Sequence, residues 1–482
     1  MLLLKVYFYK NKYKMKKWNY SVNEKYTSIC KFLVGWIIPI LLFLPFRGTS
    51  QPMNVLFIVS DDLNSEVGVY GSERAVTPHL DRLAETGMRF TSAHAQYPVC
   101  NQSRNSFLSG MRPNETGLPM GWEALRKLVP DVTTLPQLFR KNGYYTASIG
   151  KVFHISNWDK RWPDKGGWRL GDSLSWDFRV NCPPANQGKS QVPPFPRKGE
   201  KLNWPGHSGA IDYGMISYED DLMHEDGQAT QEAIRQLDLN KDKPFFLAVG
   251  YRRPHAPFVA PEKYFFPYPL NTMHLPDPGD RSDVTKLAFT VHPPNYGEPE
   301  EMKKMKMSYL ASVSFLDSQV GRLLQSLEDH RLMDNTIIVF LSDHGFHLGE
   351  HGQWHKFTLY EESTRVPLLI RVPGMTKPGS VSDEIVELVD LFPTLKELCG
   401  MPEQNQQLAG QSLAPLLKNS PDSWKEKPAI TQVRRGKDEK AVMGYSIRTK
   451  DYRYNEWWTE TENPEMVACE LYDLKGDPEE EV

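Results

Sequence analysis

The chain has 482 residues, of which 40% are hydrophobic and 24% are charged, and its formal net charge is −3. This length predicts one large domain with a smaller second one, and the nearly balanced charge argues against nucleic acid as a partner. The net charge does not exclude a polyanion bound in a local basic cleft.

Residues 1–50 are predicted to be a secretory signal peptide. Residues 1–28 are rich in lysine, and an uncharged apolar stretch at residues 32–46 is followed by small residues. This stretch is shorter than the roughly 20 residues of a membrane span, so no stable membrane anchor is expected; a retained anchor is the alternative. The protein is therefore predicted to be secreted or periplasmic after cleavage of the signal peptide.

Five cysteines are scattered along the chain. Cys30 lies in the predicted signal peptide, which leaves Cys100, Cys182, Cys399 and Cys469. Four scattered cysteines after an export signal do not form a disulfide scaffold. One disulfide bridge and a special role for one thiol both remain open.

Residues 51–420 alternate strand-like with helix-like segments. Residues 55–59 form a continuously apolar run, as in a buried parallel strand, and similar runs recur three times further along. Residues 79–90 and 302–327 have the apolar spacing of amphipathic helices. This alternation predicts an open α/β sheet in a large first domain, residues 51–420.

Two long stretches break this pattern and are expected to be surface excursions that shape a cleft. Residues 158–204 hold five of the 12 tryptophans, and residues 267–299 hold seven prolines. Beyond about residue 420 the segments look like antiparallel strands with alternating faces. Residues 421–482 are therefore predicted to form a small second domain.

Four strand-like runs end in chemically capable side chains, and active sites of open α/β sheets form at the carboxyl ends of the strands. A single acidic pair after a strand could equally be a loop carboxylate or a helix cap. Four such strand ends together favour an active site. The residues are Asp61 and Asp62, Lys151 with His154, Arg252 and Arg253 with His255, and Asp343 with His344.

These residue types indicate a metal site next to an anion site. Three carboxylates beside a histidine suit a divalent cation, and oxygen ligands favour Ca²⁺ or Mg²⁺ over zinc. Lys151, Lys356 and Arg104 are cations that stabilise an oxyanion ester. His154 and His255 exchange protons near neutral pH. Together they predict transfer of a phosphoryl or sulfuryl group.

Cys100 is the candidate nucleophile. It begins a predicted helix, and both the helix N-terminus and nearby Arg104 favour anions. Two alternatives remain open for this residue: it is a small cysteine buried in the core, or its thiolate attacks directly.

Seven segments of residues 53–482 resemble, in order, those of the type I sulfatases of the alkaline phosphatase superfamily, and most closely the iduronate-2-sulfatase branch. They are NVLFIVSDDL, TPHLDRLAETGMRF, CNQSRNSFLSGMRP, GKVFH, GYRRPHAPF, SDHGFHLGEHGQWHK and LYDLKGDPEE. The resemblance implies an alkaline-phosphatase-like α/β sandwich: a large mixed, mostly parallel sheet flanked by helices, plus a small C-terminal domain with an antiparallel sheet.

The resemblance also implies the chemistry. Cys100 would be oxidised to formylglycine by a formylglycine-generating enzyme, and the aldehyde would hydrate to a geminal diol. One hydroxyl would attack the sulfur of a sulfate ester, and the second would lose its proton as sulfate is eliminated.

Roles for individual residues follow from the same resemblance. One Ca²⁺ (Mg²⁺ as the less favoured ion) would be bound by Asp61, Asp62, the modified Cys100, Asp343 and His344. Arg104 and Lys151 would stabilise the formylglycine hydrate. His154 would take the proton during elimination, His255 would protonate the leaving alcohol, and Lys356 would hold the sulfate.

One position departs from the family pattern Cys-x-Pro-x-Arg. Residue 102 is glutamine instead of proline, whereas Cys100 and Arg104 are both present. Because the other site residues are in place, we still expect Cys100 to be converted.

Several other polar residues are expected to have ordinary roles. His347, His351 and His355 are spaced four apart and are predicted to line the cleft rather than bind zinc. Asp390 is predicted to be a structural cap near a helix start. Arg434 and its neighbour at position 435 are expected to be either solvated charges or contacts to a substrate carboxylate.

The sequence predicts an exported sulfatase that acts on a uronate-containing polysaccharide or its oligosaccharides, in algal polysaccharide or glycosaminoglycan degradation. The sulfated sugar is its expected substrate partner. A phosphoester or phosphonate hydrolase of the same superfamily and a non-catalytic protein that binds sulfated glycans are the alternatives. The sugar, the sulfate position, exo or endo action and the oligomeric state are left open.

Overall fold

The computed structural model describes residues 52–117, 123–154, 171–181, 202–203, 210–211, 213–216, 220–289 and 298–481. The predicted signal peptide, Cys182 and most of the 158–204 excursion lie outside these residues. Within the described part, no helix has the length and apolar character that a membrane span needs.

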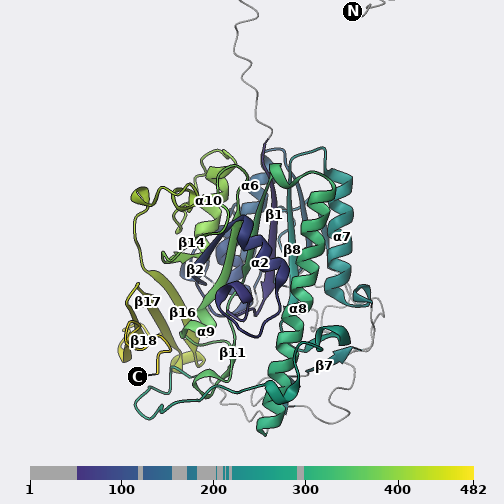
Figure 1. The fold of residues 1–482 in the computed structure, drawn as a ribbon. Helices are drawn as coiled ribbons and strands as arrows, with labels where there is room; N and C mark the ends of the chain where they lie inside the picture. The colour runs from purple at the N-terminus through teal and green to yellow at the C-terminus, as the bar shows by residue number, and fades with distance from the viewer. Residues whose placement is uncertain are drawn as a thin grey trace, which may run out of the picture. The chain divides into compact units, whose positions relative to one another are not determined.

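A nine-stranded sheet forms the centre of the fold (Figure 1). Its order is β14-β2-β13-β10-β1-β8-β3-β4, and β15 also pairs with β2. All pairings are parallel except those of β13 with β10 and with β2. The predicted mixed, mostly parallel sheet is thereby confirmed. The strands are β1 (Asn54–Asp61), β2 (Met88–His94), β3 (Tyr145–Gly150), β4 (Phe178–Val180), β8 (Phe245–Pro254), β10 (Thr336–Ser342), β13 (Arg365–Arg371), β14 (Ser380–Ser382) and β15 (Val386–Glu387).

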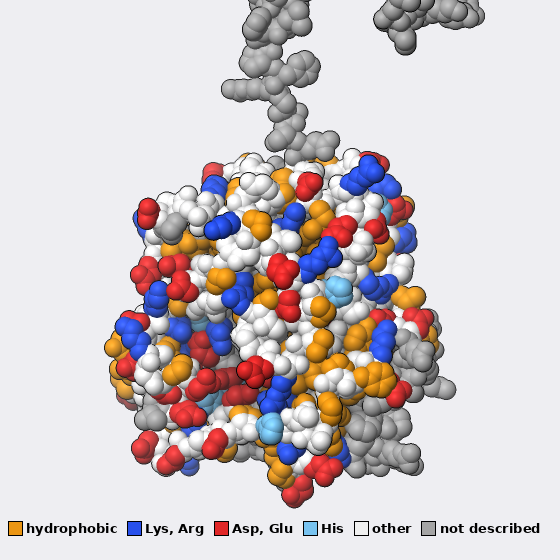
Figure 2. All heavy atoms as spheres, in the orientation of Figure 1, with side chains coloured by type: hydrophobic (Ala, Val, Ile, Leu, Met, Phe, Trp, Pro, Cys, Tyr) orange, Lys and Arg blue, Asp and Glu red, His pale blue; other side chains and the backbone are white. Residues whose placement is uncertain are grey.

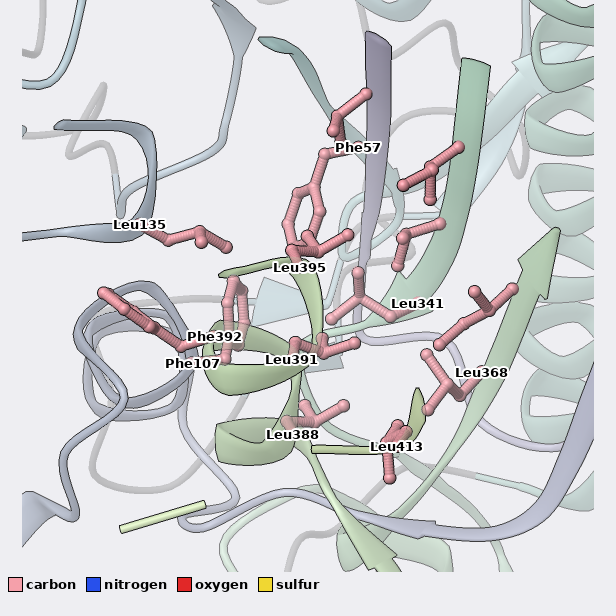
Figure 3. Packing of buried hydrophobic residues seen from close by; sticks show 14 of the residues in the cluster. Phe57, Phe107, Leu135, Leu341, Leu368, Leu388, Leu391, Phe392, Leu395 and Leu413 are labelled. Carbon is pink, nitrogen blue, oxygen red and sulfur yellow. The ribbon is translucent and has the colours of Figure 1, made fainter. Parts of the chain in front are cut away.

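Helices cover both faces of this sheet, which is why β1 is apolar at every position from Val55 to Val59. Leu56 and Ile58 pack in the cluster on one face, and Phe57 and its odd-numbered neighbours pack on the other. The first face is covered by α2 (Pro78–Thr86), α7 (Glu225–Asn240) and α8 (Pro299–Asp329). The second is covered by α3 (Cys100–Ser109), α6 (Leu135–Lys141) and α10 (Leu391–Leu398), as the packing in Figure 3 shows.

Helix α8 confirms the predicted helix at residues 302–327 and extends it at both ends. It starts with Pro299 in the first turn, followed by two acidic residues that favour the positive end of the helix dipole. The predicted apolar stripe from Tyr309 to Leu327 is buried against the sheet and α7.

A second, four-stranded antiparallel sheet follows near the C-terminus, as predicted. Its order is β16-β17-β18-β19. Both sheets belong to one compact unit, Pro52–Val482, and the division into domains at residue 420 remains a prediction. The strands are β16 (Ala429–Arg435), β17 (Val442–Arg448), β18 (Tyr452–Thr459) and β19 (Met466–Asp473).

Short elements complete the described part of the fold. They are the helices α4 (Pro113–Thr116), α5 (Leu125–Leu128), α9 (Glu361–Thr364) and α11 (Ala414–Leu417), and the strand pairs β5 (Leu202–Asn203) with β6 (Ala210–Ile211), β7 (Tyr213–Ile216) with β9 (Phe258–Pro261), and β11 (His347–Leu348) with β12 (Trp354–His355).

The carboxyl ends of β1, β3, β8 and β10 meet at one edge of the large sheet. Two facing glycines allow β3 and β8 to approach closely there: a Cβ atom on Gly150 would lie 2.2 Å from the carbonyl oxygen of Gly250, and one on Gly250 would lie 2.0 Å from that of Lys151. This close contact places Lys151 beside the end of β8. The chemically capable strand ends are thus brought to one place.

Candidate active site

Five potential metal ligands meet at this edge of the sheet. Asp61 ends β1 and Asp62 follows it, Asp343 and His344 follow β10, and Cys100 begins α3. Together with His255, they form two overlapping groups, and within each group all ligand atoms lie within 4.8 Å of one another. The first group is Asp61, Cys100, Asp343 and His344, and the second is Asp61, Asp62, Cys100 and His255.

The turn after β1 directs the two aspartates into the site. Asp62 has a left-handed backbone (φ 65°), which is uncommon for a residue other than glycine. Its amide donates a hydrogen bond to Asp343 Oδ1 at 3.2 Å, and the Leu63 amide donates to Ser342 Oγ at 2.9 Å. Side chains at the end of β10 and directly after it therefore fix the turn that follows β1.

Cys100 is the first residue of α3, and the N-terminus of a helix favours negative charge. Its Sγ atom lies 3.3 Å from His344 Nε2 and 3.2 Å from Lys356 Nζ. Burial and Asp61 raise the pKa of the thiol, but Lys151 and Lys356 outweigh them, so that this pKa lies below its ordinary value. The position thus suits a nucleophile beside an anion site.

Arg104 is completely buried one helical turn after Cys100. Its guanidinium donates to Asp343 Oδ2 at 2.8 Å, to Asp61 Oδ1 at 3.2 Å and to the carbonyl oxygen of Lys151. Lys151 in turn binds Asp61 through Nζ. These contacts lock the cations to the carboxylates that face residue 100.

Lys356 reaches the site from a backbone-strained loop. Its neighbours His355 (φ 87°) and Phe357 (φ 77°) both have left-handed backbones, a conformation that persists in larger residues only when the surroundings enforce it. Nζ lies 2.5 Å from Asp62 Oδ1. Although burial disfavours a charged lysine, Asp62 and Cys100 raise the pKa of Lys356, so the side chain is cationic.

Two histidines flank the cluster. His255 Nε2 lies 3.9 Å from Asp62 Oδ2, and its side chain keeps 25% of its surface exposed, so it faces the open side of the site. His154 follows Lys151 after the end of β3. Burial, followed by the charge of Lys151, places the pKa of His154 well below its ordinary value, so this imidazole is neutral at pH 7.

The donor set fits a hard divalent cation. Three aspartates offer carboxylate oxygens, and oxygen is the ligand that Ca²⁺ and Mg²⁺ prefer. Burial raises the pKa of Asp62 to about 7, so the charged form of this carboxylate is disfavoured in the site as it stands. A cation bound here would supply the missing positive charge.

All ten predicted site residues lie at this edge of the sheet. The sequence did not indicate two further contacts: Ser103 Oγ binds the Asp343 carbonyl oxygen, and Tyr309 of α8 hydrogen-bonds to the turn after Asp62. A hydroxyl in the first turn of the helix that Cys100 begins could have suggested the first contact. No sequence feature indicated the hydrogen bond of Tyr309, because its position in the apolar stripe predicts only that the ring packs in the core.

The remaining polar residues have structural contacts. His347 Nε2 lies 2.7 Å from Thr358 Oγ1, and the His351 ring stacks on Tyr360 at 4.2 Å. Among the described residues, neither belongs to a group that could hold a metal. Asp390 ends the short 3-10 helix η9 (Leu388–Asp390), directly before α10, and accepts the Glu387 amide at 2.8 Å at the start of η9. The prediction of a cap near a helix start is thereby confirmed, although the capped helix is η9 and not α10.

The prediction for the basic pair needs correction at one position. Arg434 binds Glu460 at the surface. Arg435, however, is only 5% exposed: its guanidinium lies 5.2 Å from the Trp457 ring centre, and Nε donates to the Leu287 carbonyl oxygen at 3.0 Å. The prediction of a solvated charge is wrong for this residue, because the aromatic ring and the loop around Leu287 cover it.

Comparison with known families matches almost the whole described chain. The model of the family described as "Sulfatase" matches residues 53–401, and that of "N-sulphoglucosamine sulphohydrolase, C-terminal" matches residues 349–482.

Two curated proteins illustrate the similarity of this chain to known sulfatases. Iduronate 2-sulfatase of Mus musculus is 34% identical, with 90% of each chain covered. A protein of Formosa agariphila named "Sulfatase" is also 34% identical, with 89% of this chain and 82% of the relative covered.

Solved structures show the same fold. A protein in complex with its substrate D-glucosamine-2-N,6-O-disulfate superposes with a TM-score of 0.66 at 24% identity, over 89% of this chain and 93% of the other. The phosphonate monoester hydrolase of Agrobacterium radiobacter superposes with a TM-score of 0.67 at 21% identity, over 89% and 91%. At these identities the likeness concerns the fold alone.

Proposed function

Since this chain belongs to the sulfatase family and is a sulfuric ester hydrolase, we propose that it is an exported enzyme that removes sulfate from a uronate-containing polysaccharide or its oligosaccharides. The likeness to iduronate 2-sulfatase supports a uronic acid. Algal polysaccharides and glycosaminoglycans both contain such sugars.

The observation that carries the proposal is the position of residue 100. Its Sγ atom lies between Lys356 Nζ and His344 Nε2, beside the buried carboxylates and at a helix N-terminus. In the active enzyme this residue is formylglycine, made from Cys100 by a formylglycine-generating enzyme. The Sγ atom then stands for the hydroxyl oxygens that the hydrated aldehyde carries on the same carbon.

In this proposal one Ca²⁺ would be held by Asp61, Asp62, Asp343, His344 and residue 100. When bound, it would favour loss of the proton from a neighbouring hydroxyl and neutralise negative charge on the ester. Arg104 binds Asp343 and Lys151 binds Asp61, and in this proposal both cations stabilise the hydrate.

The first step transfers the sulfuryl group to residue 100. Lys356 neutralises the charge of the sulfate oxygens. A hydroxyl of residue 100 gives its proton to a neighbouring aspartate carboxylate of the site and attacks the sulfur. As the bond between sulfur and the sugar oxygen breaks, His255 gives its proton to that oxygen. Burial lowers the pKa of His255 well below its ordinary value in the free site, and the negative charge of a bound sulfate ester favours the protonated imidazole that this step needs.

The second step releases sulfate and restores the aldehyde. His154 takes the proton of the second hydroxyl, the carbon–oxygen double bond forms again, and the bond from that carbon to the sulfate oxygen breaks. A neutral imidazole is required for this role, in agreement with the lowered pKa of His154. Addition of water to the aldehyde completes the cycle.

The test combines mass spectrometry with turnover. The wild-type protein and the Cys100→Ala variant are made together with a formylglycine-generating enzyme, and the peptide that contains residue 100 is analysed. We expect loss of the sulfur atom, gain of an aldehyde oxygen and release of sulfate from a 2-O-sulfated uronate disaccharide by the wild type alone. An intact thiol, or equal turnover by the variant, would refute the proposal.

A second candidate, a phosphonate or phosphate ester hydrolase, is favoured by one observation. The unmodified thiol of Cys100 has a lowered pKa next to two lysines, which also suits direct attack on a phosphorus ester. Hydrolysis of phenyl phosphonate monoesters by protein with an intact thiol, without release of sulfate from sulfated sugars, would support this alternative.

A further inference from the structure

Tyr309 lies on α8, and its hydroxyl reaches the turn that carries Asp62. It donates a hydrogen bond to the carbonyl oxygen of Asp62 at 2.8 Å and accepts one from the amide of Asn64 at 3.0 Å. Asn64 Nδ2 continues the chain of contacts to the carbonyl oxygen of Phe346 at 2.9 Å. One hydroxyl therefore binds the backbone on both sides of Leu63.

The ring of Tyr309 is also fixed. It is completely buried, meets the Phe258 ring edge-on at a centroid distance of 5.4 Å and stacks on the Phe346 ring at 5.9 Å. Phe258 lies three residues after His255 in the chain, and Phe346 lies two residues after His344. Tyr309 thus contacts the segments after β1, β8 and β10 at the same time.

The turn needs such support because Asp62 has the left-handed backbone described above (φ 65°). This conformation is unfavourable for aspartate compared with glycine. If the turn relaxed, the Asp62 carboxylate would leave its place within 4.8 Å of Asp61, Cys100 and His255. The backbone bonds to Tyr309 oppose this relaxation without any contact to the substrate.

We propose that Tyr309 is a positioning residue that keeps Asp62 in the geometry for metal binding. The inference rests on the proposed Ca²⁺ site. It predicts that loss of the hydroxyl weakens Ca²⁺ binding while the aromatic packing, which the phenyl ring retains, preserves the fold.

The experiment compares Tyr309→Phe with Tyr268→Phe. Tyr268 is a matched control, because its buried hydroxyl also accepts a backbone amide, that of Val76 at 2.9 Å, and contacts Ser314 of α8. The Ca²⁺ dissociation constant of each purified protein is measured by calorimetry after chelation, and thermal unfolding is recorded with chelator and with Ca²⁺. These readouts do not depend on turnover.

We expect Tyr309→Phe to bind Ca²⁺ about tenfold or more weakly and to gain less thermal stability from Ca²⁺ than the wild type. Tyr268→Phe should lose a similar amount of stability in chelator but bind Ca²⁺ like the wild type. Equal Ca²⁺ affinity of Tyr309→Phe and wild type would overturn the inference, as would equal weakening in both variants. Absence of Ca²⁺ binding by the wild type would instead refute the proposed metal site.

A measurement on the wild type keeps the inference testable if Tyr309→Phe does not fold. Amide hydrogen exchange of residues 60–66 is followed with and without Ca²⁺. If Tyr309 holds the turn, the Asn64 amide is protected already in the metal-free protein. Protection that arises only after Ca²⁺ is added would contradict the inference, because the metal and not Tyr309 would then order the turn.

Discussion

Gln102 stands where the family pattern has proline, and its side chain is buried in the first turn of α3. Proline is tolerated in a first helical turn, because the amides there have no partner within the helix. The glutamine therefore has no evident advantage for the helix itself. If Cys100 is converted to formylglycine as proposed, the effect of Gln102 is expected in that conversion, where the activating enzyme would bind the chain around Cys100.

The Gln102→Pro substitution is predicted to raise the fraction of Cys100 that is converted to formylglycine. The backbone of α3 accepts proline at this position, so activity per formylglycine should stay unchanged. Quantitative mass spectrometry of the peptide, together with turnover normalised to the converted fraction, checks this. Gln102→Ala is the control and should not raise conversion. An unchanged fraction in Gln102→Pro would show that residue 102 is not read.

His255 is predicted to matter only for poor leaving groups. A sugar alkoxide needs a proton as it departs, whereas a nitrophenolate does not. His255→Ala should therefore lower kcat/KM for a sulfated uronate disaccharide by about 10²–10⁴-fold and change it far less for a nitrophenyl sulfate. Steady-state rates on both substrates check this. Equal losses on both would place His255 in binding rather than in proton transfer.

At the scale of elements, the meeting of the polar residues at the strand ends was predictable, because each of these strands is an apolar run that can be recognised by itself. The apolar runs predicted β1, β3, β8 and β10, and the side chains that follow them meet because parallel strands end at one edge. Lys356 differs, because the left-handed residues on either side of it, His355 and Phe357, direct its side chain, and no periodicity encodes them. The contacts of Tyr309 span 245 and 247 positions of the chain, so local pattern cannot indicate them.

Contacts between helices can also carry ionisable groups that no sequence pattern reveals. Asp317 of α8 accepts the amides of His79 and Leu80 at the start of α2, at 3.1 and 2.8 Å from Oδ1. Burial nevertheless raises the pKa of Asp317 to about 7. The hydrogen bonds to α2 are therefore accepted by a carboxylate whose charged form is disfavoured by burial.

Asp317→Asn is predicted to change the pH dependence of stability. The pKa of Asp317 in the folded protein lies above the unfolded value of 3.8. Below pH 4 the group is protonated in both states and does not lower the free energy of unfolding. Between pH 4 and about pH 7 its ionisation lowers the free energy of unfolding progressively. This loss then stays constant, at about 4 kcal/mol as an upper limit. The variant should gain stability relative to the wild type as pH rises from 4 to 8, measured by urea unfolding. If the difference in unfolding free energy between the variant and the wild type were the same at pH 4 and pH 8, the raised pKa would be contradicted.

At the scale of the whole molecule, buried charges connect the second sheet to the catalytic sheet. Arg453 of β18 is completely buried and binds both Glu361, at the start of α9, and Glu480, after β19. Glu480 also accepts the Glu361 amide at 2.9 Å. One guanidinium thus neutralises two acids from separate segments. Further acidic side chains gather beside the C-terminal sheet on the face shown in Figure 2.

Arg453→Leu is predicted to destabilise the protein by about 3–5 kcal/mol, because it leaves buried carboxylates without their cation. The loss should be larger at pH 8 than at pH 5. Burial already raises the pKa of Glu480 to about 7 with Arg453 present, and without the guanidinium it must rise further. At low pH the orphaned acids take up protons, which removes part of the cost.

Urea unfolding at the two pH values measures this effect, and Arg434→Leu is the matched control. Arg434 lies on β16 of the same sheet and binds Glu460, but both side chains are partly exposed, so its removal should cost less than about 1 kcal/mol at either pH. If Arg453→Leu cost no more than the control, the small sheet would be held by apolar packing alone. If the cost were large but equal at both pH values, it would come from lost packing of the arginine side chain and not from its charge.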